Sequence, residues 1–284
     1  MKKKDKTPFV LKTVRWVFPK LEKIAPSMAH RYFIKIFFTP LRYPIPRKER
    51  DVLSTAEKLT VQAFGKKVQV YFWGPVSGPV VLLVHGWAGR AAQFRKFIPA
   101  LSDAGYRVVG FDGPAHGRSE GRQTSILEFE SALQEIFKRA GEPEALIAHS
   151  FGGVASLYAA MNGLKIKKLI NIASPTIGDE IISTYLKTIN GSASSGEAFK
   201  TYMMKTFNKS FDEFSALHII KHLRQDVKLL LIHDEDDKEV TIRHPQELIK
   251  VYSKAQLFRT SGLGHTRILK DDAVIKKSLD FIQM

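Results

Sequence analysis

EALIAHSFGGVASLYAA, residues Glu144–Ala160, joins a short apolar run to an apolar helical pattern. The run Ala145–Ala148 is short enough to be a strand buried on both faces, whereas the residues after Gly153 have the spacing of a helix with an apolar face. A chain that passes from strand to helix within a few residues must bend sharply, so the side chains near the bend must be small. Ala148, Gly152 and Gly153 meet that requirement.

Ser150 lies at the predicted bend, next to the amino end of the predicted helix. The unpaired N–H groups and the partial positive charge of a helix amino end stabilise negative charge that develops nearby. This is the arrangement that a nucleophilic serine needs. The alternative interpretation is a Ser-Gly-Gly turn without chemistry, between a strand and a helix of any α/β protein.

Around Ser150 the sequence resembles the nucleophile elbow of the α/β-hydrolase fold, G-x-S-x-G, with Ala148 in place of the first glycine. The resemblance extends from about Leu59 to the carboxyl end of the chain. It implies a serine esterase or lipase-like hydrolase, with a mostly parallel central sheet, helices on both faces of that sheet and a small helical cap.

The pattern of apolar segments also favours this α/β class. Short continuous apolar runs are typical of parallel strands that helices cover on both faces. Helical patterns alternate with these runs, and right-handed crossovers then place the strands in one parallel sheet. The runs are 80–84, 107–111, 145–148, 167–173 and 227–232.

This alternation stops between about Thr176 and Arg224, where amphipathic helical pieces occupy the position of a cap. We therefore expect four segments in the chain of 284 residues. They are a basic helical N-terminal segment with a linker (1–50), the first part of the hydrolase core (51–175), the helical cap (176–225) and the second part of the core (226–284). No substrate-binding residue of the cap is predicted.

The loop His85-Gly86-Trp87-Ala88-Gly89 follows the apolar run 80–84. In the α/β-hydrolase family, an H-G-x-x-G loop supplies one N–H of the oxyanion hole, and the residue after the nucleophile supplies the other. The resemblance therefore implies Trp87 and Phe151 as the two donors. The alternative is a glycine turn that only ends the strand.

Candidates for an acid and a base follow the last two predicted strands. The segment 233–240, HDEDDKEV, resembles the family's acid loop H-G-x-x-D-x-x-V, which implies Asp237 as the acid and leaves Asp236 as the second candidate. A carboxylate cluster that binds a cation or solubilises the loop is the alternative. His265 stands in the family's G-x-G-H arrangement and is the implied base. Ser150, Asp237 and His265 then follow the order nucleophile, acid, base.

The resemblance implies that this chain cleaves the carboxylic ester of a small-molecule acyl substrate through an acyl-enzyme, without a metal or an organic cofactor. Thioesterase, amidase and carbon–carbon hydrolase activities use the same three residues and remain open. The alternative of another class is a binding protein that keeps the fold without turnover and associates with a membrane.

Four other polar residues have structural interpretations. Asp112 and His116, in the loop FDGPAHGRS, are interpreted as residues that fix that loop and not as catalysts. His218 and His222 have the i, i+4 spacing of metal ligands on one helix face. No third ligand accompanies them, so solvated or cap-packing histidines are the favoured interpretation.

The formal net charge of +16 is concentrated at one end, because residues 1–50 alone contribute +11. These residues contain two basic, aromatic-rich helical patterns, and two hypotheses stay open for them. The helices lie on an anionic membrane surface, or they pack against the hydrolase body with their basic faces solvated. No helix-turn-helix, RNA-recognition or zinc-finger pattern accompanies the charge, so a nucleic-acid partner is not expected.

Cysteine is absent, which is compatible with a reducing cytosol. Lys12, Arg15 and Lys20 interrupt the apolar stretch near the N-terminus, so the sequence predicts neither a secretory signal nor a transmembrane helix. We expect a cytoplasmic protein, with peripheral contact at the inner face of the membrane under the first hypothesis.

Overall fold

The computed structural model describes residues 9–284, and the lysine-rich residues 1–6 of the basic N-terminal segment lie outside them. The described chain divides into two compact units. The smaller unit contains the residues up to Phe38 together with Ile177–Glu213, and the larger unit contains Thr39–Thr176 and Phe214–Met284. Each unit therefore combines two stretches that are distant in sequence.

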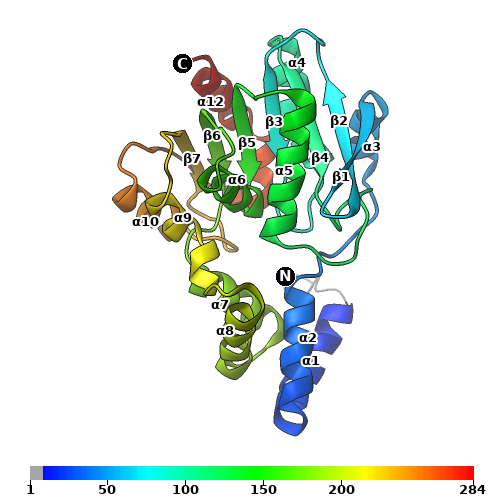
Figure 1. Cartoon of the computed structure of the whole chain (residues 1–284), viewed down its shortest axis with the longest axis vertical. Helices are drawn as coiled ribbons and strands as arrows, with labels where there is room; N and C mark the ends of the chain where they lie inside the picture. Colours follow the sequence, from blue (N-terminus) through cyan, green and yellow to red (C-terminus); the bar gives the residue numbers. More distant parts are fainter. Residues whose placement is uncertain (1–8) are drawn as a thin grey trace, which may run out of the picture. The chain divides into compact units, whose positions relative to one another are not determined.

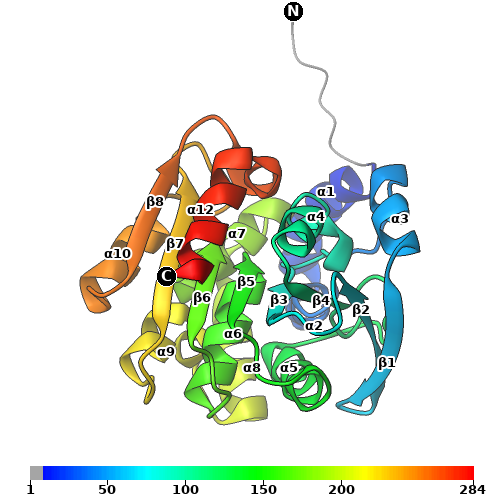
Figure 2. The same ribbon diagram turned by 90° about the horizontal axis from the view of Figure 1, so that it is seen from above.

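The larger unit is built on one sheet of eight strands in the order β1-β2-β4-β3-β5-β6-β7-β8 (Figure 2). Strands β4, β3, β5, β6, β7 and β8 pair in parallel, whereas β2 pairs antiparallel with both β1 and β4. The strand bounds are β1 Glu57–Ala63, β2 Lys66–Trp73, β3 Val80–Val84, β4 Arg107–Asp112, β5 Ala145–His149, β6 Lys168–Ile172, β7 Lys228–Asp234 and β8 Gln256–Thr260.

Helices cover both faces of this sheet, which confirms the predicted fold class. In Figure 2, α4 and α12 lie on one face, and α5 and α6 lie on the other. The helices of the larger unit are α3 Arg47–Ser54, η1 Ala91–Phe94, α4 Phe97–Asp103, α5 Ile126–Ala140, α6 Phe151–Met161, α9 Ala216–Lys221, α10 Arg243–Val251, α11 Gly264–Arg267, η3 Ile268–Lys270 and α12 Asp272–Gln283.

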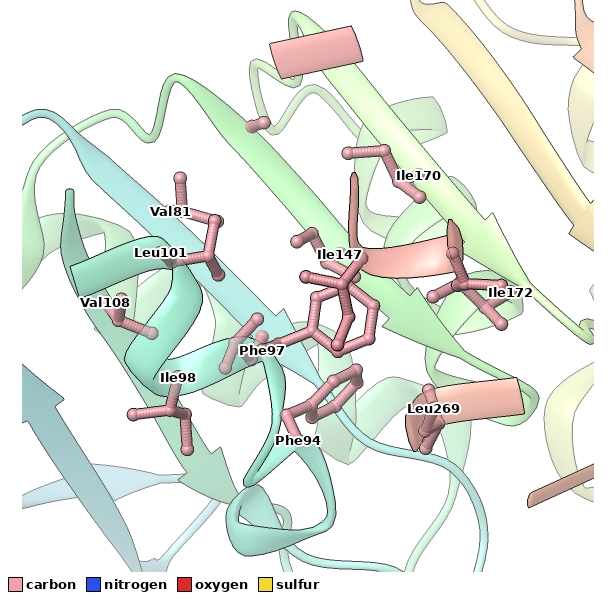
Figure 3. Packing of buried hydrophobic residues seen from close by; sticks show 14 of the residues in the cluster. Val81, Phe94, Phe97, Ile98, Leu101, Val108, Ile147, Ile170, Ile172 and Leu269 are labelled. Carbon is pink, nitrogen blue, oxygen red and sulfur yellow. The ribbon is translucent and has the colours of Figure 1, made fainter. Parts of the chain in front are cut away.

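The main core lies between the sheet and the helices α4 and α12 (Figure 3). Successive side chains of a strand point to opposite faces, so Val81 and Leu83 of β3 enter this core together. Phe94, Phe97 and Leu101 reach it from η1 and α4. The parallel strands carry apolar side chains on both faces because helices cover both faces of the sheet. The strands β3, β5, β7 and β8 run in the same direction, so their carboxyl ends lie at the same end of the sheet.

The helix after β3 differs from its sequence-based prediction. The apolar spacing predicts one helix over Ala91–Ala104, whereas the structure has a short 3-10 turn, η1, and then α4 from Phe97. Pro99 explains the late start, because proline lacks an N–H and is tolerated in a helix only within the first turn. A helix that began at Ala91 would place Pro99 in its interior.

Among its described residues the smaller unit contains four α-helices: α1 Phe9–Ile24, α2 Pro26–Phe37, α7 Gly178–Ile189 and α8 Ala193–Phe207. The short η2 Phe211–Phe214 begins in this unit and ends at the first residue of the larger one. Helix α1 packs against α2 and α7, and α8 packs against the same two helices (Figure 1). The four helices therefore close around a shared interior.

Aromatic side chains fill that interior. The rings of Phe33 and Phe37 lie 5.9 and 4.3 Å from the ring of Phe199, and Tyr185 lies 4.5 Å from Phe37. The sequence division into 1–50 and 176–225 separates these residues, whereas the structure places them in one core. Periodicity shows which face of a helix is apolar, but it does not show which distant helix covers that face.

Residues 39–50 belong to the larger unit. The guanidinium of Arg42 donates to the carbonyl oxygens of Ala115, Ser119 and Gly121, at 2.9, 2.5 and 3.1 Å. The segment expected to be a linker is thereby fixed on the loop that follows β4. Within residues 9–284, no helix combines the length and the apolar content that a bilayer crossing requires.

Candidate active site

Ser150 joins β5 to α6 with φ 51° and ψ −124°. A positive φ is sterically unfavourable for a residue with a side chain, so neighbouring contacts must hold it. The Ser150 N–H donates to the carbonyl of Ile172 at 2.8 Å, and the Ser150 carbonyl accepts the N–H of Gly153 at 2.9 Å. These two bonds fix the bend between strand and helix at the serine itself.

Gly152 and Gly153 allow α6 to approach the sheet. A β-carbon on Gly152 would lie 2.4 Å from the carbonyl oxygen of Val84, and one on Gly153 would lie 1.8 Å from Oδ1 of Asn171. Neither glycine has a positive φ. The small residues expected near the bend are therefore needed because the helix packs closely on the sheet. The residue with the strained, positive φ is Ser150.

His265 lies between the other two predicted catalytic residues. Its Nε2 is 3.1 Å from Oγ of Ser150, and its Nδ1 is 2.7 Å from Oδ2 of Asp237. A carboxylate only accepts, so Nδ1 carries the proton that is donated to Asp237, and Nε2 is left to accept the Ser150 hydroxyl. The three side chains come from the loops after β5, β7 and β8, at one edge of the sheet.

Asp237 is buried and held in its ionised form. Its Oδ1 accepts the backbone N–H groups of Glu239 and Val240 at 2.9 and 3.0 Å. Burial acts to raise the pKa of this carboxyl, but the hydrogen bond from His265 and the two N–H groups outweigh it, so the pKa lies below its ordinary value. Asp237 therefore accepts from His265 as a carboxylate at neutral pH.

Asp236, the second candidate for the acid, contacts a different group. Its carboxylate accepts the hydroxyl of Ser261 at 2.9 Å and the N–H of Gly262 at 2.8 Å. The structure thus brings Asp237 to the imidazole of His265 and brings Asp236 to the loop that precedes it.

Two residues near His265 were not predicted as part of the site. Asp234 is buried and binds the loop before His265 through backbone N–H groups. His149 is also buried, and its Nε2 lies 2.9 Å from the carbonyl oxygen of His265. The replacement of the family's glycine by Asp234 was visible in the sequence, but its contacts arise only when β7 and β8 lie side by side.

The loop after β3 lies against the nucleophile. A β-carbon on Gly86 would be 2.9 Å from Cβ of Ser150, so the next residue, Trp87, lies close to the bend. Phe151 is the first residue of α6, and a first-turn N–H has no acceptor within its helix. Among the described residues, the structure gives no acceptor to the N–H of Trp87 or of Phe151.

Two buried histidines join the loop after β3 to the loop after β4. His116 donates from Nδ1 to the carbonyl of Pro114 and accepts the N–H of Ala88 on Nε2, at 2.9 and 3.1 Å. His85 accepts the N–H of Gly113 on Nε2 at 2.8 Å. Burial lowers the pKa of His85 to about 4 and that of His116 to about 3, so both imidazoles are neutral and can accept.

Asp112 also fixes backbone. Its carboxylate accepts the N–H of Ala91 at 3.0 Å, the N–H of Arg118 at 2.8 Å and the hydroxyl of Tyr71 at 3.1 Å. None of these three partners is a candidate catalytic residue, which agrees with the interpretation of Asp112 as a residue that fixes the loop.

His218 and His222 stack on each other, with ring centroids 4.2 Å apart, and Nδ1 of His222 bonds to the carbonyl of His218. In the part of the chain that the structure describes, no three His, Asp or Glu side chains are grouped in a way that could hold a metal ion. The side chains that meet at Ser150 are the imidazole of His265 and, through it, the carboxylate of Asp237.

Known proteins resemble this chain in sequence and in fold. The model of the alpha/beta hydrolase fold family matches residues 79–268. The magnesium-chelatase 30 kDa subunit of Rhodobacter capsulatus is 38% identical over 93 residues, which cover 31% of this chain and 32% of that protein. The pimeloyl-[acyl-carrier protein] methyl ester esterase of Vibrio atlanticus is 27% identical over 157 residues, which cover 54% of this chain and 59% of the esterase.

The chain thus spans about a third of the length of the first relative and about three fifths of the length of the second. Among solved structures, an esterase of Pyrococcus furiosus superposes with a TM-score of 0.65 at 18% identity, over 86% of this chain and 96% of the esterase. At that identity the likeness concerns the fold.

Proposed function

The chain belongs to the α/β hydrolase fold family, and we propose that it is a hydrolase that cleaves a carboxylic ester, with Ser150 as nucleophile, His265 as base and Asp237 as the carboxylate that orients the base. The observation that carries the proposal is the position of His265, with one ring nitrogen 3.1 Å from Ser150 and the other 2.7 Å from Asp237. A hydroxyl needs an adjacent base to become a nucleophile, and the base needs a third group to orient it.

In the first half of the reaction, Ser150 Oγ attacks the ester carbonyl and its proton passes to Nε2 of His265. The carbonyl oxygen becomes an oxyanion, which accepts the N–H groups of Trp87 and Phe151. The carbon–oxygen bond of the ester then breaks, and the alcohol leaves with the proton from His265. Asp237 stabilises the imidazolium that forms between these two proton transfers.

In the second half, water replaces the alcohol. His265 accepts a proton from the water as its oxygen attacks the acyl carbon, and the proton then returns to Ser150 Oγ as the acid departs. The neutral imidazole needed at each start fits the Nδ1–H donated to Asp237. Thioester, amide and carbon–carbon substrates would use the same groups. The methyl ester esterase among the relatives favours the ester.

A binding protein without turnover is the rival from another class. Such a protein has no need to keep a strained serine, a bonded imidazole and a buried ionised carboxylate together. The retained set therefore favours catalysis.

A comparison of three proteins tests the proposal: the wild type, Ser150→Ala and Ser77→Ala. Ser77 is exposed in the turn before β3. It therefore lies near the amino ends of the parallel strands, whereas Ser150 lies at their carboxyl ends. We expect a fluorophosphonate probe to label the wild type and Ser77→Ala, and both to hydrolyse a short-chain aryl ester. Ser150→Ala should not be labelled and should lose activity by a factor on the order of 10⁴ or more. A folded wild type that neither reacts with the probe nor hydrolyses any ester of an acyl-chain panel would refute the proposal.

A further inference from the structure

Most of the exposed large apolar side chains of the smaller unit lie on the helical hairpin formed by α1 and α2, and Met204 of α8 is a further one. Among the described residues, five of the thirteen exposed large hydrophobic side chains fall within residues 16–32. Ile24 is 83% exposed, Trp16 66% and Met28 54%. Monomeric proteins rarely gather such side chains without a partner, so this concentration calls for an explanation.

Basic side chains alternate with these apolar ones. On α1, the exposed residues Trp16, Lys20 and Lys23 recur at the spacing of one helix face, and Ile24 lies one turn after Lys20. On α2, Arg31 follows Met28 at the same spacing. We call these six residues the α1–α2 outer face. Figure 1 shows the two helices side by side.

The inward side of the same helices is already occupied. Phe18, Phe33 and Phe37 are buried, and Phe33 and Phe37 contact the ring of Phe199 in α8. The packing hypothesis for this segment therefore accounts for one side of each helix. It leaves the exposed apolar side chains of the outer face without a role.

The one acidic residue of α1 and α2, Glu22, is turned toward the interior of the unit. Its carboxylate accepts the N–H and the hydroxyl of Ser192, at 3.1 and 2.8 Å, and the hydroxyl of Ser195 at 2.6 Å. Ser192 precedes the first residue of α8, so Glu22 caps that helix and its charge complements the amino end. The outer face consequently presents positive charge with no carboxylate from its own two helices.

We propose that the α1–α2 outer face docks on the surface of an anionic lipid bilayer. Tryptophan and aliphatic side chains partition into the region between lipid headgroups and acyl chains, while Lys and Arg remain at the level of the headgroup phosphates. A helix of 16 residues interrupted by lysines is too short and too charged to span a bilayer, but it can lie in this interface.

Charge alone would also attract nucleic acid, but the apolar side chains argue against it. A phosphate backbone gives Lys20 and Lys23 a partner and gives Ile24 none. A lipid interface takes up both kinds of side chain, and each lysine near an anionic surface adds roughly a fivefold gain in binding.

Tryptophan fluorescence provides the first test, because the three tryptophans differ in exposure. Trp16 is 66% exposed, Trp73 is 5% exposed and Trp87 is half-buried. We expect vesicles of equal parts phosphatidylglycerol and phosphatidylcholine to co-sediment with the full chain and to shift its emission to shorter wavelength. Vesicles of phosphatidylcholine alone should bind at least tenfold more weakly. Trp16→Phe should lose the shift and still co-sediment.

Point variants separate the apolar from the electrostatic contribution. Ile24→Ser combined with Met28→Ser should lower the vesicle partition constant by more than tenfold. Val76→Ser is the matched control, since Val76 is 78% exposed in the turn between β2 and β3 and should leave the constant unchanged.

The charge pair Lys20→Glu with Lys23→Glu should lower the same constant by at least 25-fold at low salt. Lys58→Glu with Lys96→Glu, two exposed positions of the larger unit, is its control. All variants should keep the circular dichroism and the ester hydrolysis of the wild type.

The proposal is overturned if the full chain does not co-sediment with anionic vesicles. It is overturned as well if the outer-face substitutions leave the vesicle partition constant unchanged. It is also overturned if duplex DNA or RNA binds at physiological salt while the vesicles do not, since the face would then recognise a nucleic-acid backbone. Binding that survives on phosphatidylcholine alone would contradict the electrostatic half.

Discussion

The carboxylate of Asp234 accepts the backbone N–H of Gly264 at 2.8 Å, one residue before the candidate base His265. The same carboxylate accepts the N–H of Leu263 at 3.0 Å and the hydroxyl of Thr260 at 2.8 Å. Each oxygen has two donors when the N–H of Asp236 is included. Asp234 thus ties the end of β7 to the loop that carries the imidazole, at the position where the family's acid loop has glycine.

Asp234→Asn should therefore displace His265 without removing any reacting group. The amide keeps one accepting oxygen but turns an N–H₂ toward donors of the loop, so at least one bond is lost. A displacement of about 1 Å at a reacting group can cost on the order of 100-fold in rate. We expect kcat to fall roughly 10- to 100-fold with KM little changed.

The matched control for that experiment is Glu235→Gln, at an exposed neighbour that contacts Arg259 at 3.7 Å. Its kcat should equal that of the wild type. If Asp234→Asn melts at the wild-type temperature and keeps its kcat, then the loop holds His265 without this carboxylate, and the positioning role is wrong.

Substitution of the two candidates for the triad carboxylate, Asp237 and Asp236, should lower kcat by different factors. Asp237→Asn replaces an acceptor of the His265 Nδ1–H by a group that can donate, which favours the wrong tautomer and should lower kcat by on the order of 10⁴. Asp236→Asn alters only contacts to Ser261 and Gly262 and should lower kcat less than tenfold. Steady-state kinetics on one aryl ester decides, and a larger loss in Asp236→Asn would reverse the assignment.

Much of the fold was predictable because local patterns determine it. The strand predicted over Val80–Val84 has those bounds in the structure, since a continuous apolar run between glycine-rich turns permits little else. The bend at Ser150 was predictable from the small residues around it. The proximity of Ser150, Asp237 and His265 followed from the resemblance and from the common edge of parallel strands.

The remaining features depend on which distant segments meet. The packing of Phe37 against Phe199 joins helices that are more than 150 residues apart, and the sequence of neither helix indicates which helix it packs against. Asp234 was visible only as a departure from a glycine, because its partners come from the loop after β8. The antiparallel pairing of β2 with β4 likewise depends on the order of strands across the sheet and not on their composition.

A methyl group at Gly152 should destabilise the protein although it improves helix propensity. The new β-carbon would lie 2.4 Å from the backbone oxygen of Val84, which cannot move without displacing the end of β3. Overpacking of this kind costs about 1–3 kcal/mol. We expect Gly152→Ala to lower the free energy of unfolding by that amount in urea titrations.

Gly196→Ala is the control for helix propensity. Gly196 lies inside α8, and its added carbon would meet Cδ1 of Leu186 at 3.1 Å, at the far end of a flexible side chain. We expect a neutral or stabilising effect of up to about 1 kcal/mol. Equal losses in the two variants would show that the contact with Val84 is not the cause.

The buried histidines should make stability depend on pH below neutrality. Burial lowers the pKa of His149 to about 3, as it lowers that of His85 to about 4 and that of His116 to about 3. In the unfolded chain these groups titrate near 6.5, so as pH falls below that value the unfolded state binds protons that the folded state refuses. The contribution of these neutral histidines to the free energy of unfolding is therefore fully present above pH 6.5. It decreases from there toward pH 3–4, by up to about 1.4 kcal/mol per pH unit for each histidine.

Urea unfolding at pH 7.5, 6.5, 5.5 and 5.0 should show little change in the free energy of unfolding between the first two values and a steepening loss below pH 6.5. His222→Gln, at an exposed histidine, should leave this profile unchanged, whereas a free energy of unfolding that stays constant from pH 7.5 to 5.0 would mean that these imidazoles become protonated in the folded protein.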